Sequence, residues 1–255
     1  MTGAASGIGR ATVLEFVRDA RMRQEKAPGL LLVDMNQGGL EETARLVGEQ
    51  AGMLTVTADL ADVEQPKRLV ELAVDRFGGL DVIVSNAGVL IPGSLRDLTV
   101  LDYERTFAVN TRATWLLGQA ALPHMEGKGG AIVATASIGA VMPPPMIGAY
   151  GPSKAALTGL IRLMAQEWGP LGIRSNSVSP GPTLTGMTQN QYGHPEGRQR
   201  REAAIPVRRL GVPEDIANAI VFLSRPESGF INGIDITVDG GMMTTLLQAS
   251  VSQAK

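Results

Sequence analysis

The chain has 255 residues, of which 44% are hydrophobic and 19% are charged, and its formal net charge is −2 at pH 7. This composition is typical of a globular protein and excludes a largely disordered chain, and the near balance of charge gives no sign of a nucleic-acid or anionic-membrane partner. With no Cys and only 2 His residues, a disulfide, a thiolate nucleophile, an iron–sulfur cluster and a His-rich metal site are excluded, so we expect no metal in the functional site.

Short apolar runs alternate with longer amphipathic segments along the whole chain. This alternation predicts βαβ units, and the near-continuous apolar runs predict a parallel sheet that is covered by helices on both faces. No repeat or linker interrupts it, so we expect residues 1–255 to form one α/β domain of the doubly wound, Rossmann type. The predicted strands are Leu30–Val33, Leu54–Ala58, Val82–Val84, Ala131–Thr135, Ile173–Val178 and Ile234–Val238, and the predicted helices are Gly9–Ala20, Gly39–Gly48, Val63–Phe77, Leu101–Leu122, Pro152–Trp168 and Pro213–Leu223.

The sequence contains neither of two patterns that would place the protein in or across a membrane. No apolar run reaches the roughly 18 residues that a membrane helix needs. The first residues do not have the basic-then-apolar order of a secretory signal peptide. We therefore expect a soluble, cytoplasmic protein.

A glycine-rich segment, Thr2–Gly9 (TGAASGIG), leads into the first predicted helix. Gly3, Gly7 and Gly9 would let the backbone turn tightly and approach a pyrophosphate. The helix N-terminus would add unpaired N–H groups and the positive end of its dipole. A spaced glycine triplet by itself is only a weak indication of a nucleotide site.

Asp34 strengthens this interpretation, because it ends the next apolar run. A carboxylate at that place can accept hydrogen bonds from both hydroxyls of an adenosine ribose, and it would repel the 2′-phosphate of NADP. No Arg or Lys stands beside Asp34 to reverse the preference. The sequence therefore favours NAD over NADP.

Tyr150 and Lys154 stand four residues apart at the start of a predicted helix, so they share one helix face. A nearby ammonium favours the phenolate and would lower the pKa of the Tyr150 hydroxyl from its usual value of about 10. Such a tyrosine can exchange a proton with an alcohol or a carbonyl. Taken alone, such a pair is far more often an incidental pair of helical neighbours than a catalytic one.

The pair belongs to a larger set of motifs that resembles the short-chain dehydrogenase/reductase family, from Thr2 to about Gly241. The motifs occur in the family's order and at its spacing, which makes the resemblance specific. They are the glycine-rich segment with Ser6 and Ile8, Asp59-Leu60, Ser85-Asn86-Ala87-Gly88, Asn110, Ser137 before Tyr150, Pro180-Gly181 with Thr183 and Thr185, Pro213–Ala217, and Val238–Gly241.

The resemblance implies hydride transfer between a nicotinamide ring and a carbinol carbon. Tyr150 would be the general acid/base, Lys154 would lower its pKa and hydrogen-bond to the nicotinamide ribose, and Ser137 would hold the substrate oxygen. Asn110 would fix a helix bend and a water that relays protons to Lys154. The implied cofactor contacts are Gly3, Ser6, Gly7, Ile8, Gly9, Asp34, Asp59, Leu60, Asn86, Ala87, Gly88, Tyr150, Lys154, Pro180, Gly181, Thr183 and Thr185.

The chain departs from the family at its start. Family members usually place an apolar strand before the glycine-rich segment, whereas only Met1 precedes Thr2 here. That strand is normally central in the sheet, so a missing or truncated first strand would expose two strand edges. We favour a truncated or misassigned start over a true N-terminus, in which the gap would stay open or be filled by another segment such as the tail at residues 242–255.

Leu184–Ile205 corresponds to the family's mobile substrate lid and contains Met187, Tyr192 and His194. We interpret its arginines as a solvated face, with an anionic substrate as the alternative. Together with Leu184, the segment Met142–Met146 is predicted to line a mostly apolar pocket for a secondary alcohol or ketone. The arginines are Arg198, Arg200 and Arg201, followed by Arg208 and Arg209.

The resemblance also implies assembly through two long helices, so we expect a homotetramer, with a homodimer as the alternative. The favoured activity is that of an NAD-dependent alcohol dehydrogenase or ketone reductase. Two alternatives are an NADP-linked 3-oxoacyl-type reductase, which Asp34 argues against, and a catalytically silent nucleotide-binding protein, which the complete Ser137, Tyr150, Lys154 and Asn110 set argues against.

Overall fold

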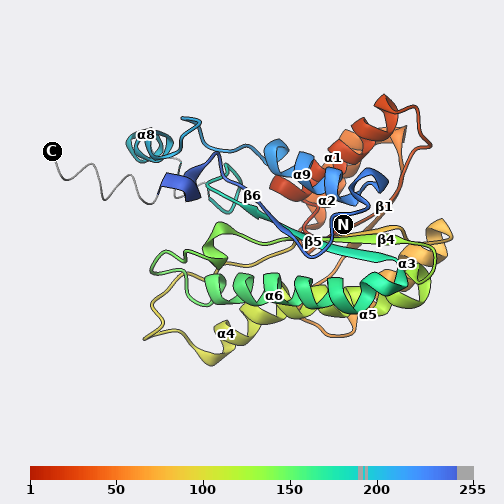
Figure 1. The fold of residues 1–255 in the computed structure, drawn as a ribbon, viewed down its shortest axis with the longest axis horizontal. Coiled ribbons are helices and arrows are strands. Elements are labelled where there is room, and N and C mark those ends of the chain that lie inside the picture. The colour runs from red at the N-terminus through yellow and green to blue at the C-terminus, as the bar shows by residue number, and fades with distance from the viewer. Residues whose placement is uncertain (189–191, 193–194, 246–255) are drawn as a thin grey trace.

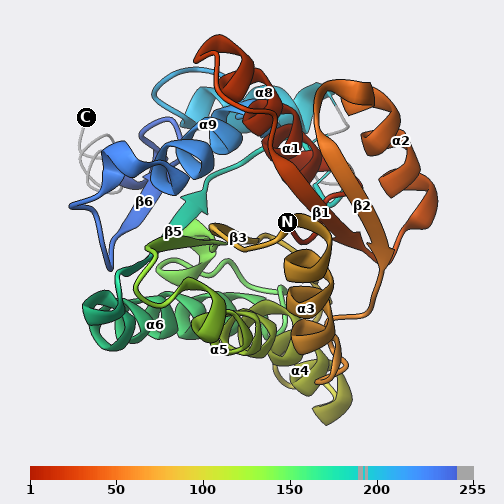
Figure 2. The ribbon, with the colours of Figure 1, turned by 90° about the vertical axis from the view of Figure 1, so that its right-hand side faces the viewer.

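The computed structural model describes residues 1–188, 192 and 195–245, which form an α/β fold with parallel strands (Figure 1). Helices cover both faces of the sheet: α1 and α9 lie on one face, and α3, α5 and α6 lie on the other (Figure 2). This is the predicted layered architecture. The helices are α1 (Gly7–Met22), α2 (Gln37–Val47), α3 (Gln65–Phe77), α4 (Val100–Phe107), α5 (Ala113–Met125), α6 (Tyr150–Trp168), α8 (Pro195–Ala204) and α9 (Pro213–Ser224).

The strands pair in parallel in the orders β3-β4-β5-β6 and β1-β2. In the register of the larger sheet, Val84 faces Val133, and Val178 faces Ile236. Because all strands run the same way, their carboxyl ends meet at one edge, which is where ligands bind in such sheets. The strands are β1 (Gly29–Asp34), β2 (Gly52–Thr57), β3 (Val82–Ser85), β4 (Gly130–Thr135), β5 (Ile173–Pro180) and β6 (Asp235–Val238).

The core lies on both sides of β4, whose residues from Ala131 onward are all buried. Ile132 packs in a cluster with α5 and α6, whereas its neighbour Val133 packs with α9 on the opposite face. Successive side chains of a strand point to opposite faces, so a strand covered on both faces must be apolar at every position. This explains the uninterrupted apolar run at Ala131–Thr135.

The predicted helix Leu101–Leu122 is not continuous. A π-helical turn, Ala108–Arg112, separates α4 from α5. The other predicted helices are found with boundaries that differ by a few residues, as α1 does by extending to Met22. Among the described residues, no helix combines the length and the apolar character required to cross a membrane.

Met1 and Thr2 connect the two parts of the sheet. The Thr2 N–H donates to the Val84 carbonyl of β3 at 3.0 Å, and the Val33 N–H of β1 donates to the Met1 carbonyl at 2.9 Å. Beyond these two residues, the edges of β1 and β3 line a cavity of about 770 Å³ together with side chains such as Phe77. A missing first strand is not established by this arrangement and stays a prediction.

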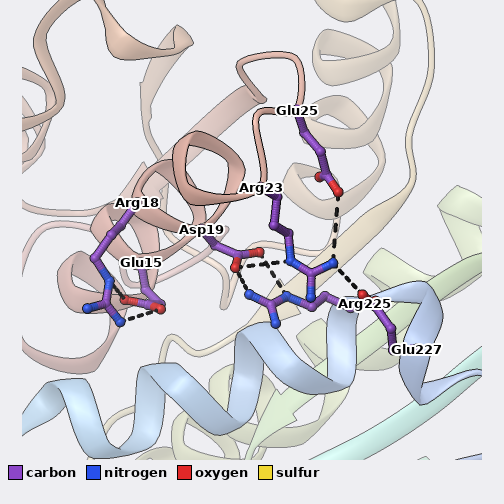
Figure 3. A network of polar contacts seen from close by, with 7 residues as sticks. All are labelled: Glu15, Arg18, Asp19, Arg23, Glu25, Arg225 and Glu227. Atoms are coloured by element: carbon purple, nitrogen blue, oxygen red, sulfur yellow. Dashed lines mark hydrogen bonds and ion pairs between the residues drawn. The ribbon is translucent and has the colours of Figure 1, made fainter.

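A network of ion pairs ties the end of α1 to the end of α9 (Figure 3). Asp19 accepts a hydrogen bond of 2.8 Å from the Arg225 Nε and lies 3.4 Å from the Arg23 Nε. Arg23 also pairs with Glu227, just beyond α9. The network therefore fixes α1, whose opposite end carries the glycine-rich turn, against the helix beside it.

Candidate active site

A cavity of about 590 Å³ opens at the carboxyl ends of the strands. It extends from Asp34, at the end of β1, to Tyr150, at the start of α6. The predicted site residues that line it are Gly3, Ser6, Gly7, Ile8, Asp34, Asn86, Ala87, Gly88, Ser137, Tyr150, Lys154, Pro180, Gly181, Thr183 and Thr185.

The glycine-rich turn forms one wall of this cavity. Gly3 and Gly7 have positive φ angles of 66° and 50°, which side chains rarely allow. A Cβ atom on Gly9 would lie 1.8 Å from the Gly3 carbonyl oxygen, so the first turn of α1 can pass under the loop only without a side chain. Ser6, at the N-cap of α1, makes no side-chain hydrogen bond to the helix. The wall thus offers the N-terminus of α1 to an anionic ligand.

Asn86 holds the glycine-rich turn in place. Its Nδ2 group donates to the carbonyl oxygens of Thr2 and Gly3, each at 3.3 Å, and its Oδ1 accepts from the Thr135 hydroxyl at 3.0 Å. The Thr2 hydroxyl accepts from the Asn86 N–H at 3.0 Å and from the Ala87 N–H at 3.1 Å. These bonds couple the ends of β3 and β4 to the loop and keep the cavity wall rigid.

Asp34 is fixed by two backbone amides. Its Oδ2 accepts from the Ala5 N–H at 3.1 Å, and its Oδ1 accepts from the Asn36 N–H at 3.0 Å. Both oxygens retain further acceptor capacity, because an ionised carboxylate has about four lone-pair sites. Asp34 can therefore accept hydrogen bonds from ligand hydroxyls in the cavity that it lines.

Tyr150 and Lys154 lie one helical turn apart in α6, and the Lys154 ammonium is 5.8 Å from the centre of the Tyr150 ring. The ammonium donates a hydrogen bond of 2.7 Å to the Thr135 carbonyl. Burial lowers the pKa of Lys154 to about 8. Burial also raises the pKa of Tyr150, and the hydrogen bond with Ser137 offsets this only in part. This direction differs from the expected lowering of the Tyr150 pKa, because the loss of hydration of the phenolate exceeds the effect of the Ser137 hydrogen bond.

Asn110 lies in the π-helical turn, 1% exposed, and does not line the cavity. Its Oδ1 accepts from the Val89 N–H at 2.8 Å, and its Nδ2 donates to the Val89 carbonyl at 3.0 Å and to the Ser153 hydroxyl at 2.9 Å. A Cβ atom on Gly88 would lie 3.3 Å from the Asn110 Oδ1 and 3.4 Å from the Lys154 Nζ. Asn110 therefore stands behind the cavity, close to Lys154.

Three other predicted contacts also lie off the cavity wall. Gly9 is beneath the loop in α1. Leu60 is 5% exposed and packs in the core with Val33. Asp59 pairs with Arg105 at 3.2 Å. The structure therefore gives Asp59 and Leu60 no place in the cavity, although they follow β2 near Asp34.

The remaining wall contains residues that the sequence did not single out as cavity-lining. Met142 and Pro144 line it as expected, but Met146 is 62% exposed, and Leu184 packs in a cluster with Tyr192. His194 lies outside the described residues. No local pattern marks the additional residues, because they converge through tertiary packing. They include Leu90, Thr135, Ile147, Thr188, Arg201, Ala204, Met242, Met243 and Thr245.

These groups fit a nicotinamide dinucleotide. The helix N-terminus and small residues at one wall suit a pyrophosphate, and the Asp34 carboxylate suits ribose hydroxyls. At the other end, Tyr150, Ser137 and Lys154 supply a phenol, an alcohol and an ammonium around a common space.

Comparison with known proteins gives consistent results. The model of the family described as Enoyl-(Acyl carrier protein) reductase matches residues 3–243. The chain is 36% identical to the L-rhamnose 1-dehydrogenase (NAD(P)(+)) of Azotobacter vinelandii over 96% of both chains. It is 34% identical to the D-threitol dehydrogenase of Mycolicibacterium smegmatis, over 94% of this chain and 90% of the relative. A crystal structure of a short-chain dehydrogenase/reductase described as a glucose/ribitol dehydrogenase, from Brucella melitensis, superposes with a TM-score of 0.86 and 32% identity over 94% of each chain.

Proposed function

Because the chain belongs to the short-chain dehydrogenase/reductase family and is an oxidoreductase that acts on CH–OH groups, we propose that it transfers hydride between NAD and a secondary alcohol or ketone. The observation that carries this proposal is the convergence of Ser137, Tyr150 and Lys154 with the glycine-rich turn in one cavity. When bound, the cofactor supplies the hydride donor or acceptor.

Tyr150 moves the proton. In reduction, its phenol O–H donates a proton to the carbonyl oxygen of the ketone, and in oxidation its phenolate accepts the proton of the alcohol. Ser137 hydrogen-bonds to the same oxygen and orients it. The buried Lys154 ammonium, held by the Thr135 carbonyl, stabilises the phenolate and donates to the ribose of the nicotinamide half.

Asn110 acts from behind the cavity. We propose that it keeps the bend between α4 and α5 and positions a proton path to Lys154, as its place beside Gly88 and its bonds to Val89 and Ser153 suggest. It is therefore assigned a positioning role.

Asp34 is proposed to select NAD. Its carboxylate is held by the Ala5 and Asn36 amides and would accept from the adenosine ribose, while repelling a 2′-phosphate. The related L-rhamnose 1-dehydrogenase is described with NAD(P)(+), so comparing the activity with NAD⁺ and with NADP⁺ tests this role of Asp34.

The substrate is proposed to be a small alcohol or its ketone. The named relatives act on rhamnose and threitol, and the cavity combines hydroxyl groups with the apolar Met142, Met187 and Leu90. A homotetramer and a cytoplasmic location complete the proposal.

A cofactor-binding and turnover experiment tests this. Thermal unfolding with saturating NADH or NADPH should show a shift of a few degrees with NADH, since a ligand at about 100 times its Kd adds roughly 2.7 kcal/mol. Rhamnose, threitol and simple secondary alcohols are then screened with NAD⁺ for formation of the reduced nicotinamide. A shift with NADPH alone would favour the NADP-linked alternative. Binding without turnover of any alcohol or 3-oxoacyl substrate would favour a silent nucleotide-binding protein.

A further inference from the structure

Arg201 places a positive charge in the cavity that the proposed hydride transfer does not use. It lies on α8 and lines the same cavity as Tyr150 and Lys154. Figure 1 shows α8 at the end of the molecule where α6 begins. The charged side chains among the described lining residues are Asp34, Lys154 and Arg201.

Two of the neighbouring arginines form ion pairs with other residues. Arg198 pairs with Glu202 at 2.9 Å within α8, and Arg209 pairs with Asp215 at 2.8 Å. Within the described ranges, Arg201 has no carboxylate within ion-pair distance. None of residues 189–191, 193–194 and 246–255 is Asp or Glu. The side-chain carboxylates of this chain therefore leave the Arg201 charge uncompensated.

The two other charges in the cavity already have roles. Asp34 accepts from the Ala5 and Asn36 amides at the end of β1. Lys154 donates to the Thr135 carbonyl beside Tyr150. Of these three charged side chains, Arg201 is the one without a hydrogen-bond partner within the part of the chain that the structure describes.

Arg201 is an exposed residue, and its guanidinium lies beside one aromatic ring. Its guanidinium carbon lies 5.9 Å from the centre of the Tyr192 ring, which is 9% exposed and supports the cation through its π face. Met142, Met187 and Met243 line the same cavity. Arg201 is exposed, and Met142 and Met187 are 40% and 51% exposed, so this end of the cavity is open to solvent and an ion pair formed there is screened by salt.

We propose that Arg201 makes the enzyme selective for ketones and alcohols that carry a carboxylate, and this inference rests on the proposed oxidoreductase function. A guanidinium presents parallel N–H donors that match the two oxygens of a carboxylate. The carboxylate binds to Arg201, and the carbonyl at the other end of the substrate faces Tyr150 and Ser137. In reduction, a bound reduced nicotinamide would supply the hydride to the carbonyl carbon and would be left oxidised, while Tyr150 would give a proton to the oxygen.

The test compares each keto acid with its uncharged methyl ester. Acetoacetate and levulinate differ by one methylene between the two groups, so the pair also measures the distance from Arg201 to the reacting carbon. Wild-type kcat/KM for the better acid should exceed that for its ester by about threefold to fivefold, as for an exposed ion pair, and the preference should shrink at high salt. Arg201→Gln should remove most of this preference by acting on the acid, while the ester changes by less than about twofold.

Two matched variants separate charge from structure. Arg201→Lys keeps the charge without the fork and should retain part of the preference. Arg200→Gln removes a neighbouring charge on α8 that does not line the cavity and should behave as the wild type does. The Kd for NADH is measured for each variant and should stay unchanged.

A second readout keeps this inference separate from the proposed function. In Tyr150→Phe loaded with NADH, binding of levulinate and of its ester is followed by the change in NADH fluorescence. If the acid binds more tightly than the ester, and Arg201→Gln removes this difference, the inference is supported. This holds even if no ketone is turned over, in which case only the proposed function fails. The inference is overturned if Arg201→Gln has no effect, if it lowers the affinity for acid and ester equally, or if it raises the Kd for NADH. A wild-type preference for the ester overturns it as well.

Discussion

The Gly3 carbonyl oxygen occupies the place that a Cβ atom of Gly9 would need, at a separation of 1.8 Å. The glycine-rich turn and the first turn of α1 are therefore packed backbone to backbone. Asn86, which donates to the same carbonyl oxygen, holds the turn from the other side. The shape of the proposed pyrophosphate site thus depends on one missing side chain and one amide.

Gly9→Ala should abolish NADH binding, because the new Cβ must push the Gly3 peptide out of position. We expect at least a hundredfold weaker Kd, which is about 2.7 kcal/mol or more, measured by NADH fluorescence. Gly159→Ala is the matched control: it lies in α6 with no atom within 4 Å of its Cβ position, and it should add about 1 kcal/mol of stability without changing the Kd. Unchanged NADH binding in Gly9→Ala would mean that the turn does not hold the cofactor.

Tyr150→Phe should lower kcat by about 10² to 10⁴ while leaving the Kd for NADH within a few-fold, because it removes the proton donor but not the ring. Ser137→Ala should also lower kcat, since the substrate oxygen loses a hydrogen-bond partner. Single-turnover kinetics with NADH and a ketone measure the chemical step directly. A Tyr150→Phe enzyme with near-normal turnover would remove Tyr150 from its assigned role.

Lys154 should make the stability of the cofactor-free protein depend on pH in a defined window. Burial lowers its pKa from 10.5 to about 8, so between these values the unfolded chain binds the proton that the folded chain has lost. Folding stability therefore rises with pH from 8 to 10.5, and below pH 8 the full cost of burying the charge is present.

The difference in the free energy of unfolding between Lys154→Met and the wild type measures the cost of burying the Lys154 charge. The variant has no such cost, so its advantage should be greatest below pH 8 and should shrink by about 3 kcal/mol on approaching pH 10.5. Denaturant unfolding of both proteins across this range measures it. A difference that does not change with pH would show that the buried ammonium keeps its ordinary pKa.

Asp34→Ser should move the cofactor preference toward NADP. Removing the carboxylate abolishes its repulsion of a 2′-phosphate and its acceptance from the ribose hydroxyls, so the ratio of kcat/KM for NAD⁺ to that for NADP⁺ should fall by about tenfold or more. Glu41→Gln, an equal change of charge at an exposed position of α2, is the control and should leave the ratio unchanged. A wild-type enzyme that already prefers NADP⁺ would contradict the assignment of Asp34.

The sequence predicted those features that local chemistry determines. Buried strands such as Ala131–Thr135 must be apolar at every position, and the glycine spacing at Gly3, Gly7 and Gly9 reflects a backbone contact between near neighbours. The family resemblance implied a helix bend at Asn110, but not its π-helical form, because that form is accompanied by bonds to Val89 and Ser153, distant in the sequence.

The sequence predicted which residues form the site better than it predicted their pKa values. The direction of the Tyr150 pKa depends on how completely the fold buries the phenol, which a four-residue spacing to Lys154 does not reveal. Likewise, Arg201 and Met243 reach the cavity only through the packing of α8 and the segment after β6. The arginine run raised an anionic substrate as an alternative to a solvated face, but it did not distinguish Arg201 from Arg198 and Arg200.

The π-helical turn at Ala108–Arg112 changes which side chains of α4 and α5 lie on the same helix face. It holds an extra residue, so a single helical wheel drawn through Leu101–Leu122 rotates every position after Asn110 by about 100° and misplaces the buried face of α5. Removing one residue here would restore regular hydrogen bonding but would turn Asn110 away from Val89. At this turn, a more regular helix and an intact site are mutually exclusive.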